Sequence, residues 1–177
     1  MKKYQIIYAD PPWSYGRTNC YRAPDQHYPV MTIKDIEALP ISNLADKDCI
    51  LFMWTPYITV VDAINIAKEW GFKFITIGFV WVKKNKKADS WFWGMGNWTR
   101  ANSEICLIFT KGKPKRVCAG VHSVLDDRVM KHSQKPQEAR IRIEKLMGDL
   151  PRIELFAREK TPGWDVWGNE VESDIEL

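Results

Sequence analysis

The run Ile6-Ile7-Tyr8-Ala9-Asp10-Pro11-Pro12-Trp13 is the most informative stretch of this 177-residue sequence. Its first four residues predict a short buried strand, which ends at the prolines because proline cannot donate to a sheet. Prolines also fix the backbone φ angle, so their carbonyls would be rigid acceptors beside the Asp10 carboxylate and the Trp13 indole. That set suits a planar group with an amino function, such as the 6-amino group of adenine. The alternative from these residues alone is a strand-terminating turn that Asp10 caps.

Alternating strands and helices are predicted outward from this run. Apolar runs predict buried strands over residues 49–54, 74–82 and 105–110, and a last one over 152–157. Helical signals cover residues 33–39 after a Thr32 cap, 57–70 before a Gly71 stop, and about 136–147 after Pro136. The loop of about 20 residues between Lys83 and Asn102 is long enough to be functional or disordered.

This alternation predicts an α/β fold, with a mostly parallel sheet and helices on both faces. In such sheets ligands bind at the carboxyl ends of strands, so the residues that follow Ala9 and Leu155 are the places to search. A chain of 177 residues fits one domain, residues 1–177, with a real core. Its 45% hydrophobic and 27% charged residues argue against disorder, and no apolar run predicts a membrane span.

The charge is concentrated in the middle of the chain. Residues 83–145 contain 15 of the 26 Lys and Arg but only 6 of the 22 Asp and Glu. Tryptophans are interleaved with these charges at positions 91, 93 and 98. A basic, Trp-rich segment is typical of a nucleic-acid interface, although lysine runs alone favour two solvated loops. The four cysteines show no C-x-x-C spacing, which argues against a zinc ribbon and fits reduced thiols in a cytosolic protein.

Several blocks of the sequence resemble, in order, one enzyme family. Asp-Pro-Pro-Trp after an apolar strand is the signature of the adenine-N6 methyltransferase family whose eukaryotic members methylate mRNA adenosines. The further blocks, spread over residues 6–171, are 28–32, 51–54, 79–83, 96–104, 132–136, 153–158 and 167–170. The resemblance implies a Rossmann-like, S-adenosylmethionine-dependent fold in the permuted order, with the catalytic strand first and the cofactor strand last. The chain is similar to small bacterial or phage members.

The resemblance also implies a set of site residues. It assigns catalysis to Asp10, Pro11, Pro12 and Trp13, with Asp10 stabilising the charge that develops on the attacking nitrogen. It places S-adenosylmethionine, and the product S-adenosylhomocysteine, against Asp10, Ser133, Lys135, Glu154, Phe156, Arg158, Asn169 and Glu170. It places the substrate against Tyr28, Trp81, Lys83, Asn97, Trp98, Arg100, Asn102 and Glu104. Taken singly, Lys135 also fits a basic residue before a helix, and Phe156 and Trp81 also fit the core. No metal is implied.

The expected activity is methyl transfer to the 6-amino group of adenine in nucleic acid, and DNA is favoured over RNA. The preference follows from the lack of the RNA-binding modules that the large eukaryotic members add. A target base must be single-stranded or flipped from a duplex to reach such a pocket. The alternatives are an RNA adenosine-N6 methyltransferase, a non-catalytic nucleic-acid-binding subunit, or methylation of another amine, such as cytosine or a small molecule. We expect a cytoplasmic protein with no membrane partner. It could be a monomer or a dimer, or it could act with a partner subunit.

Overall fold

The computed structural model describes residues 2–14, 31–96, 98–130 and 134–177. The strands are β1 (Tyr4–Ala9), β2 (Ala45–Thr55), β3 (Lys73–Lys84), β4 (Ser103–Lys111), β5 (Val124–Arg128), β6 (Arg152–Leu155) and β7 (Asp165–Trp167). The α-helices are α1 (Ile33–Glu37), α2 (Val60–Glu69) and α3 (Gln137–Met147), with 3-10 turns η2 (Ile41–Asn43) and η3 (Tyr57–Thr59).

The strands of the described residues form one seven-stranded sheet in the order β5-β3-β4-β2-β1-β6-β7. Only β4 runs against its neighbours β2 and β3, while the other four pairings are parallel. Six described strands therefore run in one direction, which confirms the mostly parallel sheet. The strand that carries the Asp-Pro-Pro-Trp run comes first in the chain and lies between β2 and β6, as the permuted order predicts.

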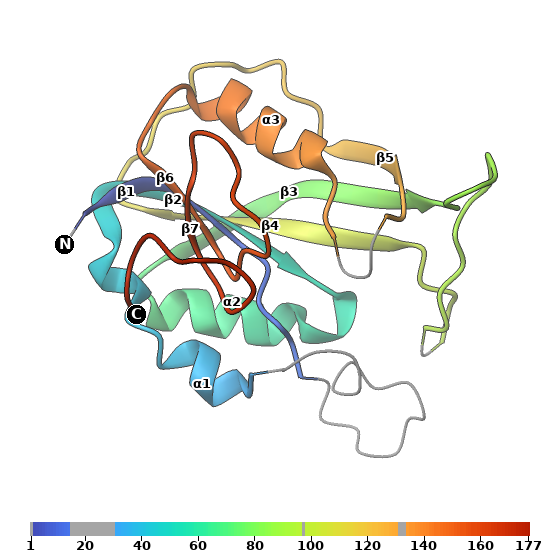
Figure 1. The fold of residues 1–177 in the computed structure, drawn as a ribbon, viewed down its shortest axis with the longest axis horizontal. Coiled ribbons are helices and arrows are strands. Elements are labelled where there is room, and N and C mark those ends of the chain that lie inside the picture. Colours follow the sequence, from blue (N-terminus) through green and yellow to red (C-terminus); the bar gives the residue numbers. More distant parts are fainter. Residues whose placement is uncertain (1, 15–30, 97, 131–133) are drawn as a thin grey trace.

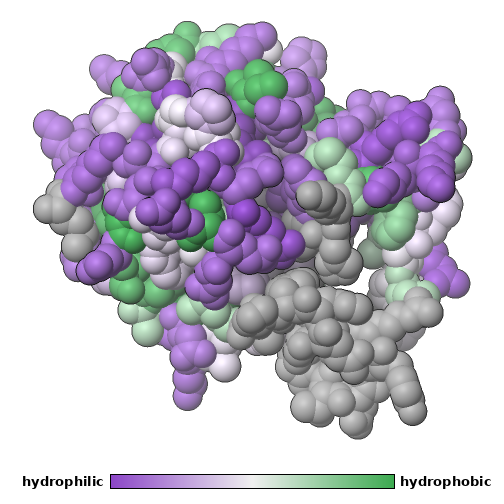
Figure 2. Space-filling model, viewed as in Figure 1, coloured by the Kyte–Doolittle hydropathy of each residue, from purple (hydrophilic) through white to green (hydrophobic). Residues whose placement is uncertain are grey.

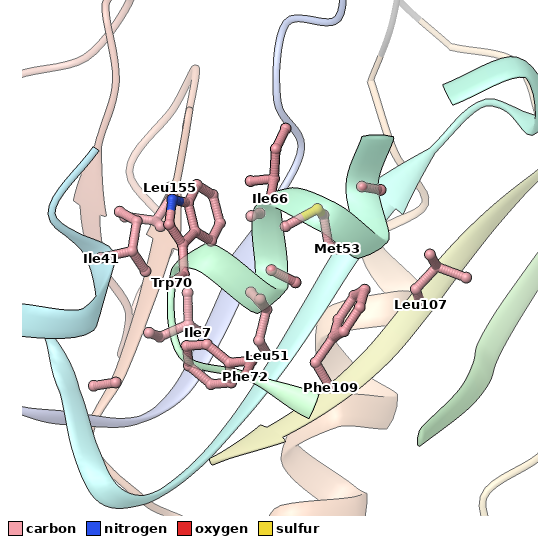
Figure 3. Close-up of a cluster of buried hydrophobic side chains, with 14 of the residues drawn as sticks. Ile7, Ile41, Leu51, Met53, Ile66, Trp70, Phe72, Leu107, Phe109 and Leu155 are labelled. Carbon is pink, nitrogen blue, oxygen red and sulfur yellow. The ribbon is translucent and has the colours of Figure 1, made fainter. Parts of the chain in front are cut away.

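Helices cover both faces of the sheet, as predicted (Figure 1). On one face α1 and α2 bury Ile36, Ile66 and Trp70 in a cluster with sheet residues such as Leu51 and Phe109 (Figure 3). On the other face α3 packs Ala139, Ile143 and Met147 over Tyr8, Phe52 and their neighbours. Successive side chains of β1 and β2 point alternately into the two clusters, because side chains of a strand alternate between the two faces of the sheet.

The predicted helix boundaries correspond to observed caps. The Thr32 side chain accepts from the Asp35 backbone N–H while the Asp35 carboxylate accepts from Thr32, which is a capping box that starts α1. Gly71, with φ +84°, follows the last turn of α2, and the Phe72 N–H reaches back to the Ala67 carbonyl. Pro136 directly precedes α3.

Two strands were not predicted from the sequence. The short strand β5 contains two aspartates, and β7 has three residues and lies between turns. The last predicted strand is present as β6, which ends at Leu155, and β7 follows it and pairs with it in parallel. The sheet therefore extends one strand beyond β6, the last strand that was predicted.

Candidate active site

A cavity lies where several strand ends meet at one edge of the sheet. The parallel strands β1, β2, β6 and β7 end there, and β4 begins there because it runs the other way. Its lining residues come mainly from the segments that follow these strands and are Asp10, Pro11, Pro12, Trp13, Met31, Thr55, Pro56, Glu104, Lys135, Phe156, Ala157, Arg158, Trp167, Gly168, Asn169 and Glu170. This is the edge at which open α/β sheets bind their ligands, as expected.

The turn after β1 is held by hydrogen bonds that the carbonyl oxygens of both prolines accept. The Pro11 carbonyl accepts from the Trp13 N–H at 2.9 Å, and the Pro12 carbonyl accepts from the Met31 N–H at 3.2 Å. Each carbonyl oxygen has two lone pairs, so counting only donors among the described residues, one acceptor position remains on each. The Trp13 ring is buried, and its Nε1–H donates to the Trp54 carbonyl at 3.0 Å. These bonds fix Asp10, the residue between strand and turn, at the cavity wall.

Asp10 belongs to a chain of alternating charges. Lys135 Nζ lies 2.6 Å from Asp10 Oδ2 and 3.3 Å from Glu104 Oε2. The other Glu104 oxygen, Oε1, pairs with the Nζ of Lys83. The four side chains are 8% to 23% exposed, so water screens these pairs less than it would at an open surface. These two carboxylates and two ammonium groups together carry no net charge.

The pKa values of these groups follow from burial and charge. Burial raises the pKa of the Asp10 carboxyl above its ordinary value, although Lys135 opposes this shift. Burial also disfavours ionised Glu104, but Lys135 and Lys83 outweigh it and hold the Glu104 pKa at about 2. For Lys135 burial favours the neutral amine, yet Asp10 and Glu104 outweigh burial and raise its pKa. Lys135 and Glu104 thus stay charged near neutral pH, whereas Asp10 is the group whose charge is easiest to change.

The predicted cofactor residues fall into two groups. Phe156, Arg158, Asn169, Glu170 and Lys135 all line the cavity together with Asp10. The Phe156 ring meets Trp167 edge to face at 5.4 Å, and Arg158 Nε lies 3.4 Å from Glu170 Oε1. An aromatic wall, an amide, carboxylates and a guanidinium are the chemistry that a nucleoside with a charged amino-acid tail requires, so this donor set fits S-adenosylmethionine.

Glu154 lies apart from the cavity. It precedes Leu155 on β6, and strand alternation turns its side chain toward the face covered by α3. There the Arg140 guanidinium donates to both of its oxygens, at 2.7 and 2.8 Å. Because both carboxylate oxygens are engaged and the residue is buried, the structure gives Glu154 an internal ion pair in place of a cavity position. Ser133 lies outside the described residues.

The predicted substrate residues are also divided. Glu104 lines the cavity, and Lys83 reaches it through Glu104. Trp81 is only 3% exposed, and its Nε1–H donates to the Asp127 carbonyl, so it lies in the core. Trp98, Arg100 and Asn102 lie outside the cavity lining, in the loop between β3 and β4. Tyr28 and Asn97 fall outside the described residues.

This loop projects from the body at the right of Figure 1. Its base is tied by hydrogen bonds from the Lys83 N–H to the Asn102 carbonyl and from the Gly94 N–H to the Ala101 carbonyl. Among its described residues, four large hydrophobic side chains are exposed, namely Trp91, Trp93, Met95 and the fully exposed Trp98. Figure 2 shows hydrophilic and hydrophobic residues side by side on the lobe that this loop forms. An ordered, basic lobe with exposed rings is compatible with nucleic acid.

Several cavity residues were not predicted from the sequence. Thr55 and Pro56 directly follow β2, so the rule that placed Asp10 could have placed them as well. Trp167 ends β7, a strand that was not predicted, and Gly168 follows it. Trp54 is fully buried, and its ring lies 5.8 Å from Lys135 Nζ. No signal in the sequence distinguishes this Trp54 position from an ordinary core residue.

Two negative observations apply to the described part of the chain. None of its helices has the length and apolar character needed to cross a membrane. Nor does that part bring together three His, Cys, Asp or Glu side chains in a group that could hold a metal ion.

Comparison with known proteins gives a consistent result. The MT-A70 family model matches residues 4–170, nearly the whole chain. The type II methyltransferase M.MunI of a Mycoplasma species is 34% identical over 197 aligned residues, covering 99% of this chain and 82% of that protein. The human N(6)-adenosine-methyltransferase catalytic subunit METTL3 and the Drosophila melanogaster MT-A70-like protein are each 29% identical over 96% of this chain. The aligned region makes up 28% and 27% of those two proteins.

Proposed function

Because the chain belongs to the MT-A70 family of methyltransferases, we propose that it transfers a methyl group to the 6-amino group of adenine in DNA. The observation that carries this proposal is the position of Asp10, a partly buried carboxylate at the wall of a cavity lined by Phe156, Asn169 and Glu170. The cavity supplies one acidic, hydrogen-bonding edge for an amino group and a neighbouring region for a nucleoside cofactor.

S-adenosylmethionine would lie along the ends of β6 and β7. Asn169 and Glu170 can bind the ribose hydroxyls, since amide and carboxylate oxygens accept from a vicinal diol. Phe156 provides a flat apolar wall, and Arg158 provides a cation for the carboxylate of the amino-acid tail. The bound cofactor supplies an electrophilic methyl group on a sulfonium.

The substrate amino group would be held by Asp10 and the proline turn. Asp10 accepts one N–H of the amine, and the free lone pair of a proline carbonyl accepts the other. Both bonds orient the nitrogen lone pair into the cavity. As the C–N bond forms and the methyl–sulfur bond breaks to leave a neutral thioether, positive charge would develop on that nitrogen, and the Asp10 carboxylate would stabilise it. Fixed orientation contributes as well, because an aligned nucleophile avoids much of the entropic cost of the encounter. The amine then loses its proton, so a strong base is not needed.

DNA is proposed over RNA on the strength of the relatives. The chain covers 82% of a type II methyltransferase, a class that modifies DNA, and only 28% of METTL3. RNA adenosine is the second candidate, favoured by the names of the N(6)-adenosine-methyltransferases. A non-catalytic binding subunit is disfavoured because Asp10, both prolines and Trp13 are present and assembled at the cavity.

Mass spectrometry of nucleosides tests the proposal. The protein is incubated with S-adenosylmethionine carrying a trideuterated methyl group and with DNA or RNA, and the nucleic acid is then digested to nucleosides. Labelled N6-methyldeoxyadenosine is expected. Label on adenosine would move the assignment to RNA, label on cytosine would contradict the adenine assignment, and binding without label would indicate a non-catalytic subunit.

A further inference from the structure

Lys83 was expected among the substrate-binding residues, but its ammonium group is directed inward. The side chain is 17% exposed, and its Nζ pairs with Glu104 Oε1. The same Nζ lies 4.9 Å from the centre of the Trp81 ring and 6.0 Å from that of Phe92, at cation–π distances. Lys86 and Lys87, a few residues further on, are exposed. Lys83 therefore differs in environment from the other lysines of the loop.

The strand register explains this orientation. Trp81 on β3 lies opposite Glu104 on the antiparallel neighbour β4. Lys83 is two residues beyond Trp81 and so projects from the same face, within diagonal reach of Glu104. The backbone is held too, since the Lys83 N–H donates to Asn102 and the Lys83 carbonyl accepts from Phe92. Neither the backbone nor the ammonium is free to swing toward a phosphate without breaking these contacts.

Glu104 links Lys83 to the reacting end of the site. One of its oxygens meets Lys83, and the other lies 3.3 Å from Lys135, which in turn donates to Asp10 at 2.6 Å. Lys135 thus faces two carboxylates, and Lys83 neutralises one of them. With Lys83 present the cluster has no net charge, and without it the cluster would carry one excess negative charge beside Asp10.

We propose that Lys83 is a positioning residue, which acts through Glu104 and Lys135 to keep Asp10 ionised and oriented, and that it is not a contact for nucleic acid. The inference depends on the proposed function only in giving Asp10 its catalytic role. The contacts that carry it are those of this chain alone.

Other ionisable groups near Asp10 do not replace Lys83. Arg158 acts on Asp10 with a favourable charge but also meets Glu170. Glu154 is on the same face of the sheet as Tyr8, but Arg140 neutralises it by donating to both of its oxygens. Burial keeps Tyr8 and Cys106 neutral, because it raises the pKa of both well above the ordinary values. The electrostatic environment that decides whether Asp10 is ionised therefore depends mainly on Lys135, Glu104 and Lys83.

The direction of the effect follows from the sign of the charge removed. In Lys83→Met, Glu104 competes more strongly for Lys135, and an unbalanced negative charge remains near Asp10. Both changes favour protonation of Asp10, so its apparent pKa should rise. If activity needs the ionised carboxylate, then on lowering the pH the activity of the variant should decline at a higher pH than that of the wild type. It should recover when the pH is raised again.

Carbon-13 NMR titration of the Asp10 side-chain carboxyl tests the proposal without turnover. We expect the Asp10 midpoint to move to higher pH in Lys83→Met and to stay near the wild-type value in Lys83→Arg, with the acid limb of kcat/KM moving in parallel. The double variant Lys83→Met with Glu104→Gln restores neutrality and should bring the midpoint back. An unmoved Asp10 midpoint in a folded Lys83→Met protein would overturn the proposal.

The salt dependence of oligonucleotide binding provides the contrast with a phosphate contact. A lysine that binds phosphate lowers the slope of log affinity against log salt by about 0.7 to 0.9 when removed. Lys87→Met removes the same charge from an exposed position, so it is the control variant with which Lys83→Met is compared. We expect Lys83→Met to leave the slope unchanged, whereas a slope lowered without an Asp10 shift would make Lys83 a phosphate contact. If the wild type transfers no methyl group, the proposed function fails, but the NMR result still decides the role of Lys83.

Discussion

Asp10 combines three properties that are seldom found in one surface carboxylate. It lies at the tip of a buried strand, a rigid two-proline turn follows it, and a buried lysine donates to it at 2.6 Å. Burial raises its pKa, whereas Glu104 in the same cluster has a pKa of about 2. Neighbouring carboxylates with separated pKa values are typical of catalytic sites. Glu104 thus balances the charges around Lys135, and Asp10 is the carboxylate proposed to meet the substrate.

The Arg140–Glu154 pair tests whether Glu154 is structural. Arg140→Met leaves a buried carboxylate without its partner, and we expect a loss of about 3–5 kcal/mol in the free energy of unfolding, measured by urea denaturation. Burial already raises the Glu154 pKa, and losing Arg140 raises it further. The folded state then binds a proton more readily than the unfolded state, so the loss should shrink as the pH falls through this raised pKa.

The double variant Arg140→Met with Glu154→Gln serves as the control for that experiment. It removes the unpaired charge, so most of the stability should return at neutral pH. It should also bind S-adenosylmethionine with an affinity within a few-fold of the wild type by calorimetry. A large loss of cofactor affinity in a stable double variant would instead make Glu154 a cofactor residue.

At the scale of elements, the ends of β6 and β7 form one unit. The Ala157 N–H donates to the Trp167 carbonyl at 2.9 Å, directly before Gly168. A Cβ on Gly168 would lie 2.1 Å from the Ala157 oxygen and 2.7 Å from its nitrogen. Only glycine permits this approach, which holds the segments carrying Phe156 and Asn169 side by side at the cavity.

Substitution of Gly168 tests this contact. Gly168→Ala should push the two segments apart, because the clashing atoms are backbone and cannot rotate away. We expect at least a tenfold loss of S-adenosylmethionine affinity by calorimetry and a loss of about 1–3 kcal/mol in stability. Gly120→Ala is the matched control, since the nearest atom to its Cβ would be Cys118 Sγ at 4.0 Å. Wild-type cofactor affinity in Gly168→Ala would contradict the role given to this contact.

The elements also show what the sequence could and could not reveal. Long apolar runs and capping residues were sufficient to predict β1, β2, β4, α2 and α3. Each of these elements has either a clear hydrophobic pattern or a clear end signal. The strands β5 and β7 were missed because neither has a long apolar run; β5 also depends on pairing with β3, which is distant in sequence, and β7 is only three residues long. Phe156 was expected at the cavity, but its left-handed conformation, with φ 62°, arises only in the folded β6–β7 connection.

The site shows the same division. The rule that ligands bind at strand ends located Asp10 and Phe156 in advance. The ion pairs of Lys135 could not be foreseen, because Lys135 is 125 residues from Asp10 in sequence and its partners depend on side-chain geometry. Trp81 illustrates the opposite case, since a tryptophan in an apolar strand can face either core or ligand, and only the fold decides.

At the scale of the whole molecule, the basic lobe between β3 and β4 projects from the same edge of the sheet as the cavity (Figure 1). Under the proposed function, we expect a strand of nucleic acid to contact the exposed tryptophans and cations of this lobe while one base enters the cavity. Binding to such a surface combines base stacking with counterion release, so it should weaken steeply as salt rises.

Trp98 provides the test of the lobe. Removing a base-stacking ring costs about 1–3 kcal/mol, so Trp98→Ala should weaken binding to an adenine-containing oligonucleotide roughly 5- to 150-fold by fluorescence anisotropy. Trp98→Phe retains a ring and should retain most of the affinity. Val61→Ala alters an exposed apolar residue of α2, away from the lobe, and should have no effect. Unchanged affinity in Trp98→Ala would exclude stacking at this position.

The most direct test of the account is the single-turnover rate of methyl transfer to adenine in a DNA oligonucleotide by the Asp10→Asn variant at saturating S-adenosylmethionine. Asparagine keeps the shape of the side chain but removes the charge that stabilises the forming bond. We predict a fall of at least about 100-fold in this rate, with oligonucleotide affinity changed by only a few-fold. A rate within a few-fold of the wild type would contradict the central role of the Asp10 carboxylate.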